Sequence, residues 1–230
     1  LALIALSLPA VRLLRVKDCE RGLYRFMFIF GNIGFLVYPV VESLLGYQAT
    51  FYVTLAVLAF QLFCWSYGVS LMRGAARFHF RWKVLRQPCV AASLAAFAIY
   101  LSGWQPPALL HQTVKYVGDI TSPIAMLIVG CSLAQLRFGQ IFGNWRMYAL
   151  AGIKMLAVPL LAYAVLRHVL TNEFVLCVLT VILCMPIATN TTILSYQYGA
   201  DETAASSGVF VSTLLSLLTI PLMMKLLFGT

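Results

Sequence analysis

The sequence predicts an all-α polytopic membrane protein. Of its 230 residues, 62% are hydrophobic and only 10% are charged, and the mean hydropathy is +0.91. A soluble domain normally carries about 25% charged residues, so this composition is typical of a chain that crosses a membrane several times. Long apolar stretches, separated by short polar or basic connections, support the same fold class.

Eight apolar stretches meet or approach the roughly 20 residues that a spanning helix requires. They are, approximately, Leu1–Val11, Leu23–Leu45, Ala49–Met72, Val84–Gly103, Ala108–Leu136, Met147–Leu170, Phe174–Tyr196 and Thr203–Leu227. The first is too short to cross a bilayer and is followed by Arg12. We therefore interpret it as the end of a helix that begins upstream, in an N-terminally truncated fragment, and expect about eight spans here.

The basic residues predict the orientation. Twelve of the sixteen lie in three alternate connections between spans: Arg12, Arg15, Lys17, Arg21 and Arg25, then Arg73, Arg77, Arg81, Lys83 and Arg86, then Arg137 and Arg146. The positive-inside rule places such connections in the cytoplasm. We expect a multi-pass protein of the cell (inner or plasma) membrane with its C-terminus outside. Because the charges flank spans instead of forming one face, we expect no nucleic-acid partner.

The polar connection at residues 73–86 divides the chain into two halves. The part after it, residues 87–230, contains five spans, and an equal first half would also contain five. Two halves of five spans insert with opposite orientation, which is the inverted-repeat plan of many secondary transporters. Residues 1–72 would then supply helices 3–5 of the first repeat, and residues 87–230 helices 6–10.

Two spans carry the same signals for an interrupted helix. Each contains a mid-span asparagine, a proline and a final glycine, namely Asn32, Pro39 and Gly46 in one and Asn190, Pro186 and Gly199 in the other. Proline removes a backbone donor and clashes with the preceding turn. In hydrocarbon an unsatisfied backbone group costs several kcal/mol, so an opened helix must be buried in protein or line a wet cavity.

Interrupted helices at matching positions predict a binding site for an anion. The N-termini of the half-helices present N–H groups, which suit negative charge. Asn32 and Asn190 add amide donors, and Thr189 and Thr191 can bond to freed carbonyls or to a ligand. Either span alone is better explained as a kink with an interhelical hydrogen bond. The pair together favours a transporter site.

Several ionisable residues fall within predicted spans, among them Lys115, Asp119 and Lys154. Lys115 and Asp119 are four residues apart and so share a helix face. Ion coupling and a structural pair near a membrane face are both open interpretations of them. We interpret Lys154 as a lysine whose stem snorkels toward the membrane interface.

Three segments of the sequence are distinctive: "GNIGFLVYP" with the following "LLG", then "DITSPIAMLIVGCSLAQL", then "MPIATNTTILSYQYGADETAASSGVFVSTLLSLLTIP". They resemble the auxin efflux carrier family, which includes the plant PIN carriers and bacterial malonate and malate permeases. The resemblance implies two inverted five-helix repeats, with an anion bound where the fourth and ninth helices cross at proline-marked breaks. It assigns Asn32 and Pro39 to one crossing segment and Pro186 and Asn190 to the other. It also implies a mobile transport domain that moves against a scaffold, and is closest to a prokaryotic permease.

The sequence as a whole therefore predicts an elevator-type secondary transporter of small organic anions, carboxylates such as malonate, malate or auxin-like compounds. The expected partners are that anion and the lipid bilayer, and a homodimer is left open. We expect no metal or other cofactor, because the sequence contains neither a metal-binding nor a nucleotide-binding motif. The alternatives are a membrane-embedded ligand sensor and an intramembrane enzyme. The three histidines (His79, His111 and His168) fall in loops or at span ends, which argues against the enzyme.

Overall fold

The computed structural model describes residues 2–74, 88–121, 123–124, 127, 130–131 and 144–229. Apart from its first two residues, the predicted linker at 73–86 lies outside these residues. Within them the chain is helical and forms no β-strand. The α-helices are α1 (Ala2–Leu13), α2 (Arg21–Ile29), α3 (Val37–Leu45), α4 (Thr50–Phe63), α5 (Val69–Met72), α6 (Pro88–Ser102), α7 (Ala108–Asp119), α10 (Trp145–Gly152), α11 (Val158–Leu166), α12 (Glu173–Leu183), α13 (Asn190–Tyr198) and α14 (Glu202–Phe228).

Three continuous helices among the described residues are long and apolar enough to cross a membrane. They run over Tyr47–Met72, Trp145–Leu166 and Glu202–Phe228, with 26, 22 and 27 residues. The other described helices are shorter, so the expected number of about eight spans stays a prediction. The chain is nevertheless an all-α protein built largely from apolar helices, as its composition indicated.

Two of the long helices contain a π-helical turn. One, Cys64–Gly68, joins α4 to α5, and the other, Ile153–Ala157, joins α10 to α11. A π-helical turn adds one residue to the helix and re-aims the side chains around it, and such turns are frequent at functional sites. The second turn carries Lys154.

Both interruptions predicted from the sequence are present. Residues 30–36 separate α2 from α3, and residues 184–189 separate α12 from α13. Both second halves also end where predicted: α3 ends at Gly46, with φ of 78°, and α13 at Gly199, with φ of 68°. A positive φ favours glycine, which has no Cβ to clash with the backbone.

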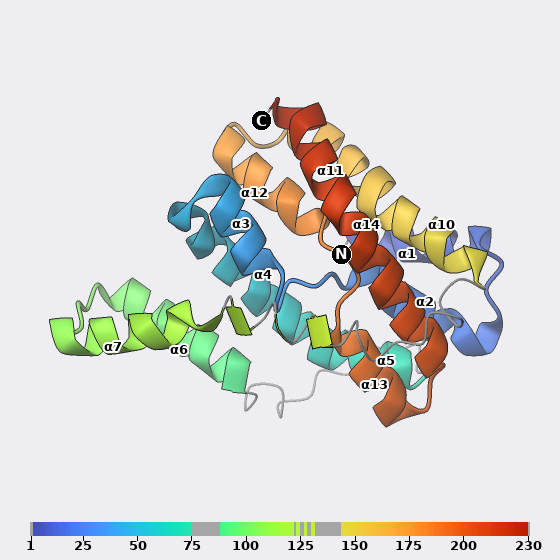
Figure 1. Cartoon of the computed structure of the whole chain (residues 1–230), viewed down its shortest axis with the longest axis horizontal. Helices are drawn as coiled ribbons and strands as arrows, with labels where there is room; N and C mark the ends of the chain where they lie inside the picture. The colour runs from blue at the N-terminus through green and yellow to red at the C-terminus, as the bar shows by residue number, and fades with distance from the viewer. Residues whose placement is uncertain are drawn as a thin grey trace.

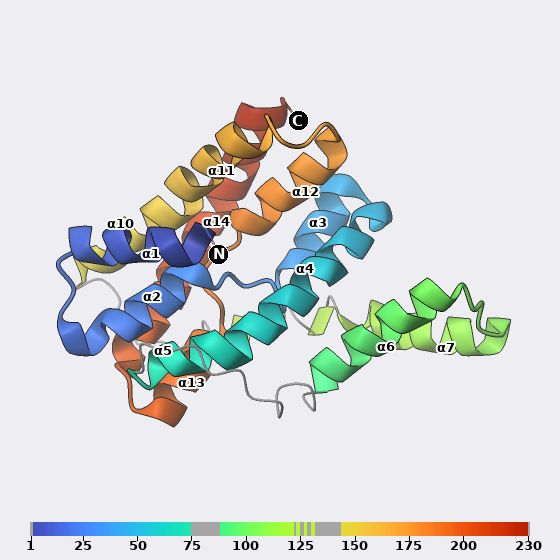
Figure 2. The same cartoon turned by 180° about the vertical axis from the view of Figure 1, so that it is seen from behind.

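The helices form one packed body with a projecting hairpin. The helix α14 packs along α10, the π-helical turn after it and α13, while α12 packs against α3 and α4, and α2 against α1 and α5. In both views α6 and α7 extend away from this body (Figure 1, Figure 2). The hairpin is joined to the body where α6 contacts α4.

Two clusters of buried apolar side chains stabilise the body, and both reach the helix breaks. Phe30 and Ile187 belong to the cluster built on α1, α2 and α10. Leu36 and Met185 belong to the cluster built on α3, α4 and α12. The two breaks therefore lie in the interior, where opened backbone can be satisfied by protein.

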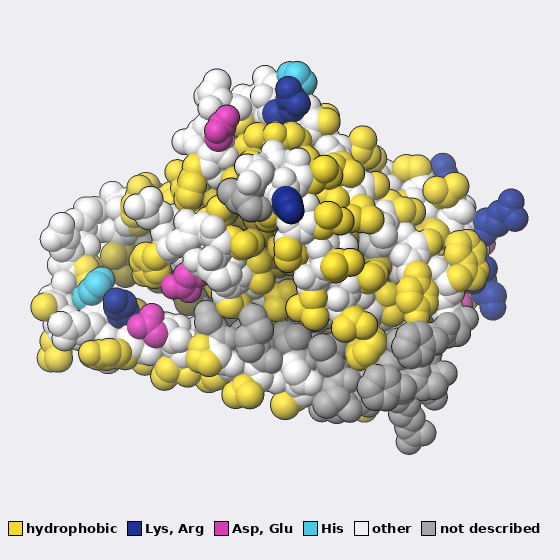
Figure 3. Space-filling model, turned by 45° about the horizontal axis from the view of Figure 1, so that its top comes forward, with side chains coloured by type: hydrophobic (Ala, Val, Ile, Leu, Met, Phe, Trp, Pro, Cys, Tyr) yellow, Lys and Arg dark blue, Asp and Glu magenta, His cyan; other side chains and the backbone are white. Residues whose placement is uncertain are grey.

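Large apolar side chains also cover the outside of the described helices. Leu217 and Leu218 on α14 are 74% and 71% exposed, and Val165 on α11 is 64% exposed. In Figure 3 hydrophobic side chains spread over the face shown, and charged ones are few and lie mainly toward its edges. Contiguous exposed apolar surface of this kind indicates contact with a membrane or with other protein.

Candidate functional site

The two helix breaks, residues 30–36 and 184–189, contact each other through their backbones, and we call this region the crossing. The N–H of Asn32 donates to the carbonyl of Pro186 at 2.7 Å, and the N–H of Ala188 donates to the carbonyl of Phe30 at 3.2 Å. Gly31 lies opposite Ile187 as in an antiparallel pair of strands. Some backbone groups that lose their intrahelical partners where the helices open are thus paired with each other across the crossing. This pairing removes the cost of leaving those groups unsatisfied in an apolar interior.

The close approach of the two backbones depends on Gly31. A Cβ at this position would lie 3.3 Å from the Cβ of Met185 and 3.4 Å from the Met185 carbonyl oxygen. The first contact is tighter than an ordinary van der Waals contact and the second is at its lower limit, so Met185 would have to shift slightly. Gly34 lies in the same break, and a Cβ there would meet no atom within 4 Å. Of the two glycines, only the first therefore packs closely against the other break.

A side-chain hydrogen bond also ties the breaks together. Nδ2 of Asn32 donates to Oγ1 of Thr189 at 2.9 Å. Both residues are buried, with exposed fractions of 1% and 5%. The sequence singled out both as ligands for a substrate. The structure brings them together, but it uses these two atoms for each other.

The longest helix contributes a residue that the sequence analysis missed. Oγ of Ser212 on α14 accepts the N–H of Ile187 at 3.0 Å and is fully buried. Without it the N–H of Ile187 would be buried and unpaired, at a cost of about 1–3 kcal/mol. The available signal was the series of hydroxyl residues along this apolar helix, which includes Ser207, Ser212, Ser216 and Thr219.

Lys154 lies in the interior, so the interpretation that its side chain snorkels to the interface is wrong. Its side chain is 3% exposed. Nζ donates to the carbonyls of Met27, Phe28 and Phe30 at 2.8, 3.1 and 2.9 Å. These carbonyls end α2, where a helix lacks intrahelical donors and carries the negative end of its dipole. A charge in a span costs roughly 2.5–3.5 kcal/mol, and these bonds offset that cost.

The start of α13 offers a donor that the fold leaves unused. Asn190 is the first residue of this helix and is half-buried. Among the described residues, neither its side-chain amide nor its backbone N–H has an acceptor. The adjacent Thr191 is different, because its hydroxyl and its N–H both donate to the Ala188 carbonyl, at 2.6 and 2.9 Å. Asn190 is thus a predicted site residue whose side-chain amide and backbone N–H both lack an acceptor among the described residues.

Similarity to known proteins identifies the family of this chain. The family described as "Membrane transport protein" matches residues 1–224. The chain belongs to this family. This confirms the resemblance to the auxin efflux carriers.

Two relatives show how far the similarity extends. An "Uncharacterized transporter" of Methanocaldococcus jannaschii is 26% identical over 218 residues, which are 90% of this chain and 69% of the relative. A "Putative malonate transporter" of Rhizobium meliloti is 24% identical over 139 residues, which are 60% of this chain and 43% of the relative. The matched segments therefore cover about two thirds of the first relative and less than half of the second.

The two prolines predicted to mark the breaks, Pro186 and Pro39, differ in position. Pro186 lies inside its break, and its carbonyl accepts the N–H of Asn32. Pro39 lies in the first turn of α3, after the break has ended. The first turn of a helix tolerates proline because its N–H groups have no intrahelical acceptor. Pro39 therefore marks where the second half begins and does not line the crossing segment itself.

Lys115 and Asp119 do not join the crossing. Both are exposed on α7, in the projecting hairpin (Figure 1, Figure 2). Both belong to the described part of the chain, and no ion pair joins them there. Lys115 and Asp119 therefore lie in a different region of the protein from the broken helices.

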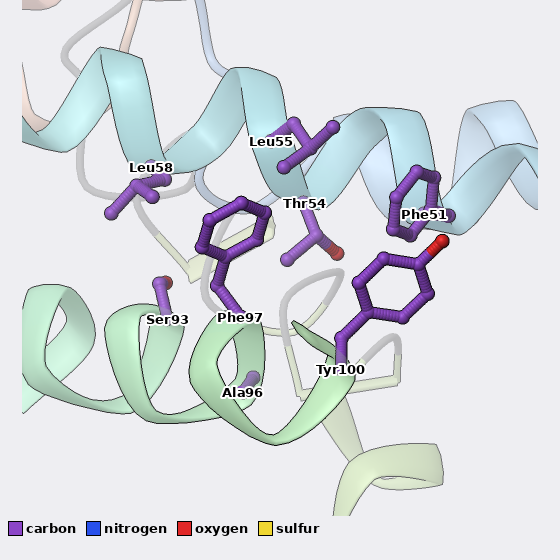
Figure 4. A pocket seen from close by; sticks show the side chains of 8 residues that line it. All are labelled: Phe51, Thr54, Leu55, Leu58, Ser93, Ala96, Phe97 and Tyr100. Atoms are coloured by element: carbon purple, nitrogen blue, oxygen red, sulfur yellow. The ribbon is translucent and has the colours of Figure 1, made fainter. Parts of the chain in front are cut away.

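A separate cavity lies between the body and the hairpin. It measures about 120 Å³ and lies between α4 and α6, with Thr54, Phe97 and Tyr100 among the side chains that face it (Figure 4). Its lining is mainly apolar, and no residue of the crossing contributes to it. We place the candidate anion site at the crossing, because there the half-buried amide of Asn190 stands at a helix N-terminus beside the paired breaks.

Proposed function

We propose that this protein is a secondary transporter of small organic anions and that the crossing of its broken helices binds the carboxylate. The observation that supports this most is the half-buried amide of Asn190, which has no acceptor among the described residues. It stands at the N-terminus of α13, where the helix dipole favours negative charge. A carboxylate accepts hydrogen bonds and has no hydrogen to donate, so it matches a site of this kind.

Neutral donors suit a carrier because it must release what it binds. An amide, a backbone N–H and a helix terminus each stabilise an anion without a fixed ion pair. Because the carboxylate is charged, its hydrogen bonds from these neutral donors are charge-assisted and about twice as strong as bonds between two neutral groups. The proposed site would therefore select for a carboxylate while allowing it to leave on the other side.

The substrate class rests on the chemistry of the site and on one relative. One relative is named as a malonate transporter, and malonate is a small dicarboxylate. We extend that class to this chain as a proposal, with malate and auxin-like carboxylates as the other candidates.

The proposed movement is of the elevator type. The crossing lies inside a body held by two apolar clusters, so it would move as part of a rigid unit. By contrast, α7 has no buried residue and α6 meets the body at α4. We propose that the α6–α7 hairpin belongs to a scaffold against which the body slides, with the basic connections on the cytoplasmic side of the cell membrane.

A ligand sensor is the alternative that binding alone does not separate from a transporter. Both could hold an anion at the crossing, but only a transporter moves it across the membrane. The deciding quantity is flux.

Counterflow in proteoliposomes tests the proposed function. The full-length protein would be reconstituted with unlabelled malonate, malate or indole-3-acetate inside, and uptake of the same labelled anion would be measured. We expect saturable exchange of at least one of them in the wild type. We expect Asn190→Ala to lose most of that exchange while its expression and melting temperature stay close to those of the wild type.

The matched control is Gln197→Ala, which removes an exposed amide from the other end of the same helix. It should exchange the anion at the wild-type rate. Equal loss in both variants would show a general effect on α13 and would remove Asn190 from the proposed site. Binding without exchange in the wild type would favour the sensor.

A further inference from the structure

Lys154 forms a complete shell of hydrogen bonds inside the protein. Its ammonium group has three N–H donors, and three backbone carbonyls accept them at 2.8–3.1 Å. A neutral amine would have only two N–H donors and would turn a lone pair toward one of these oxygens. The arrangement therefore fits the charged form of the lysine.

This positive charge has no carboxylate partner. Among the described residues the ion pair formed is that of Arg21 with Asp18, and Lys154 takes part in none. In the described part of the chain, the acceptors of Nζ are the carbonyls of Met27, Phe28 and Phe30. Rings of backbone carbonyls are the groups that selective channels use to replace the hydration shell of a monovalent cation.

The three carbonyls around Nζ, which we call the cage, also extend into the crossing. The carbonyl of Phe30 accepts both from Nζ of Lys154 and from the N–H of Ala188 in the other break. The lysine reaches it from the π-helical turn at Ile153–Ala157, which turns its side chain toward the end of α2. A change in the occupancy of the cage would therefore directly affect the hydrogen bond between Phe30 and Ala188.

We propose that the carbonyls of Met27, Phe28 and Phe30 form a monovalent-cation site, and that the ammonium of Lys154 fills it as a covalently attached cation. Because the chain supplies the positive charge, no dissolved cation is needed at this place. Lys154 acts as a positioning residue, which holds the end of α2 against the other break. The consequence for transport rests on the proposed function, whereas the existence of the cage does not.

Truncation of the lysine should convert the filled cage into an open one. Lys154→Ala removes three methylene groups and the nitrogen, and n-propylammonium carries the same number of carbons together with an ammonium group. We expect this variant of the full-length protein to melt at a lower temperature than the wild type. We expect millimolar n-propylammonium to restore a large part of that loss. The melting temperature of the wild type should not respond, because its cage is occupied.

Two controls separate filling of the cage from general effects. Tetramethylammonium at equal ionic strength has the same charge but no N–H donor, so it should not restore Lys154→Ala. Lys154→Met fills the space with a chain of similar length and no charge, so n-propylammonium should not raise its melting temperature. An equal response of the Ala and Met variants would overturn the proposal.

If Lys154→Ala is not recovered folded in plain buffer, purification with and without n-propylammonium becomes the measurement. Recovery of monodisperse protein only with the amine supports the cage, and aggregation in both buffers overturns it. A wild-type test is independent of folding: anion counterflow should be equal in sodium, potassium and N-methylglucamine buffers. A strict requirement for sodium or potassium would contradict a permanently supplied cation. A thermal response without any anion flux would retain the cage and reject the proposed function.

Discussion

Asn32 and Thr189 are separated by 157 residues along the chain, yet Nδ2 of the first donates a 2.9 Å hydrogen bond to Oγ1 of the second. The bond is buried and joins the two broken helices at the point where their backbones also pair. It links segments that the sequence marked separately.

Thr189→Val should destabilise the protein, because it leaves the amide of Asn32 buried without this acceptor. We expect a loss of about 1–3 kcal/mol in the free energy of unfolding. A detergent unfolding titration measures it. The double variant Asn32→Leu with Thr189→Val should show a coupling energy between about 0.5 and 2 kcal/mol. Strictly additive effects would mean that the bond does not contribute.

Gly31→Ala should disturb the crossing, because the new Cβ would press against the backbone and Cβ of Met185. Inserting a methyl group into packed structure typically costs about 1–3 kcal/mol. Gly34→Ala is the matched control, since its Cβ would meet no atom within 4 Å. The same unfolding titration should show a clear loss for the first variant and a much smaller one for the second. The reverse order would contradict the described approach of the two backbones.

Ser212→Ala should destabilise the protein more than Ser216→Ala. Ser212 accepts the N–H of Ile187 from another segment, whereas the hydroxyl of Ser216 donates to Thr213 within its own helix. Loss of the first leaves a buried donor unpaired, at about 1–3 kcal/mol. Melting temperatures of the two purified variants provide the comparison, and equal values would remove Ser212 from the crossing.

Pro186→Ala should slow anion counterflow more than Pro39→Ala. The first substitution restores an N–H inside the break and lets α12 extend toward α13. The second lies in the first turn of α3, where proline and alanine both fit a helix. Counterflow rates in proteoliposomes, normalised to inserted protein, test the difference. A normal rate for Pro186→Ala would show that the hydrogen bonds of the crossing are enough to keep the break open.

Local features predicted the positions of the breaks but not their partners. Asn32, Pro186 and the final glycines depart from an apolar helical pattern, so they can be recognised without any knowledge of distant contacts. The interpretation of Lys154 failed because its position in a span is compatible with either membrane face or the interior. Its acceptors lie 124–127 residues away, and no local pattern encodes that distance. Two opened helices do imply unpaired carbonyls, and a lysine within a span is a natural donor for them.

The role of individual site residues was also only partly predictable. Asn32 and Asn190 are the same residue type in similar sequence surroundings, so no local pattern distinguishes their roles. The fold commits Nδ2 of Asn32 to Thr189 and leaves the amide of Asn190 without an acceptor among the described residues. The difference arises from packing, because one side chain is buried between the breaks and the other stands at the start of a helix.

A cryo-electron microscopy structure of the full-length protein in lipid, with the anion that shows counterflow, tests the proposed anion site most directly. We expect density for the carboxylate at the N-terminus of α13, within hydrogen-bond distance of the Asn190 amide. Density for the anion in another place, for example in the cavity between α4 and α6, with the start of α13 empty, would contradict it.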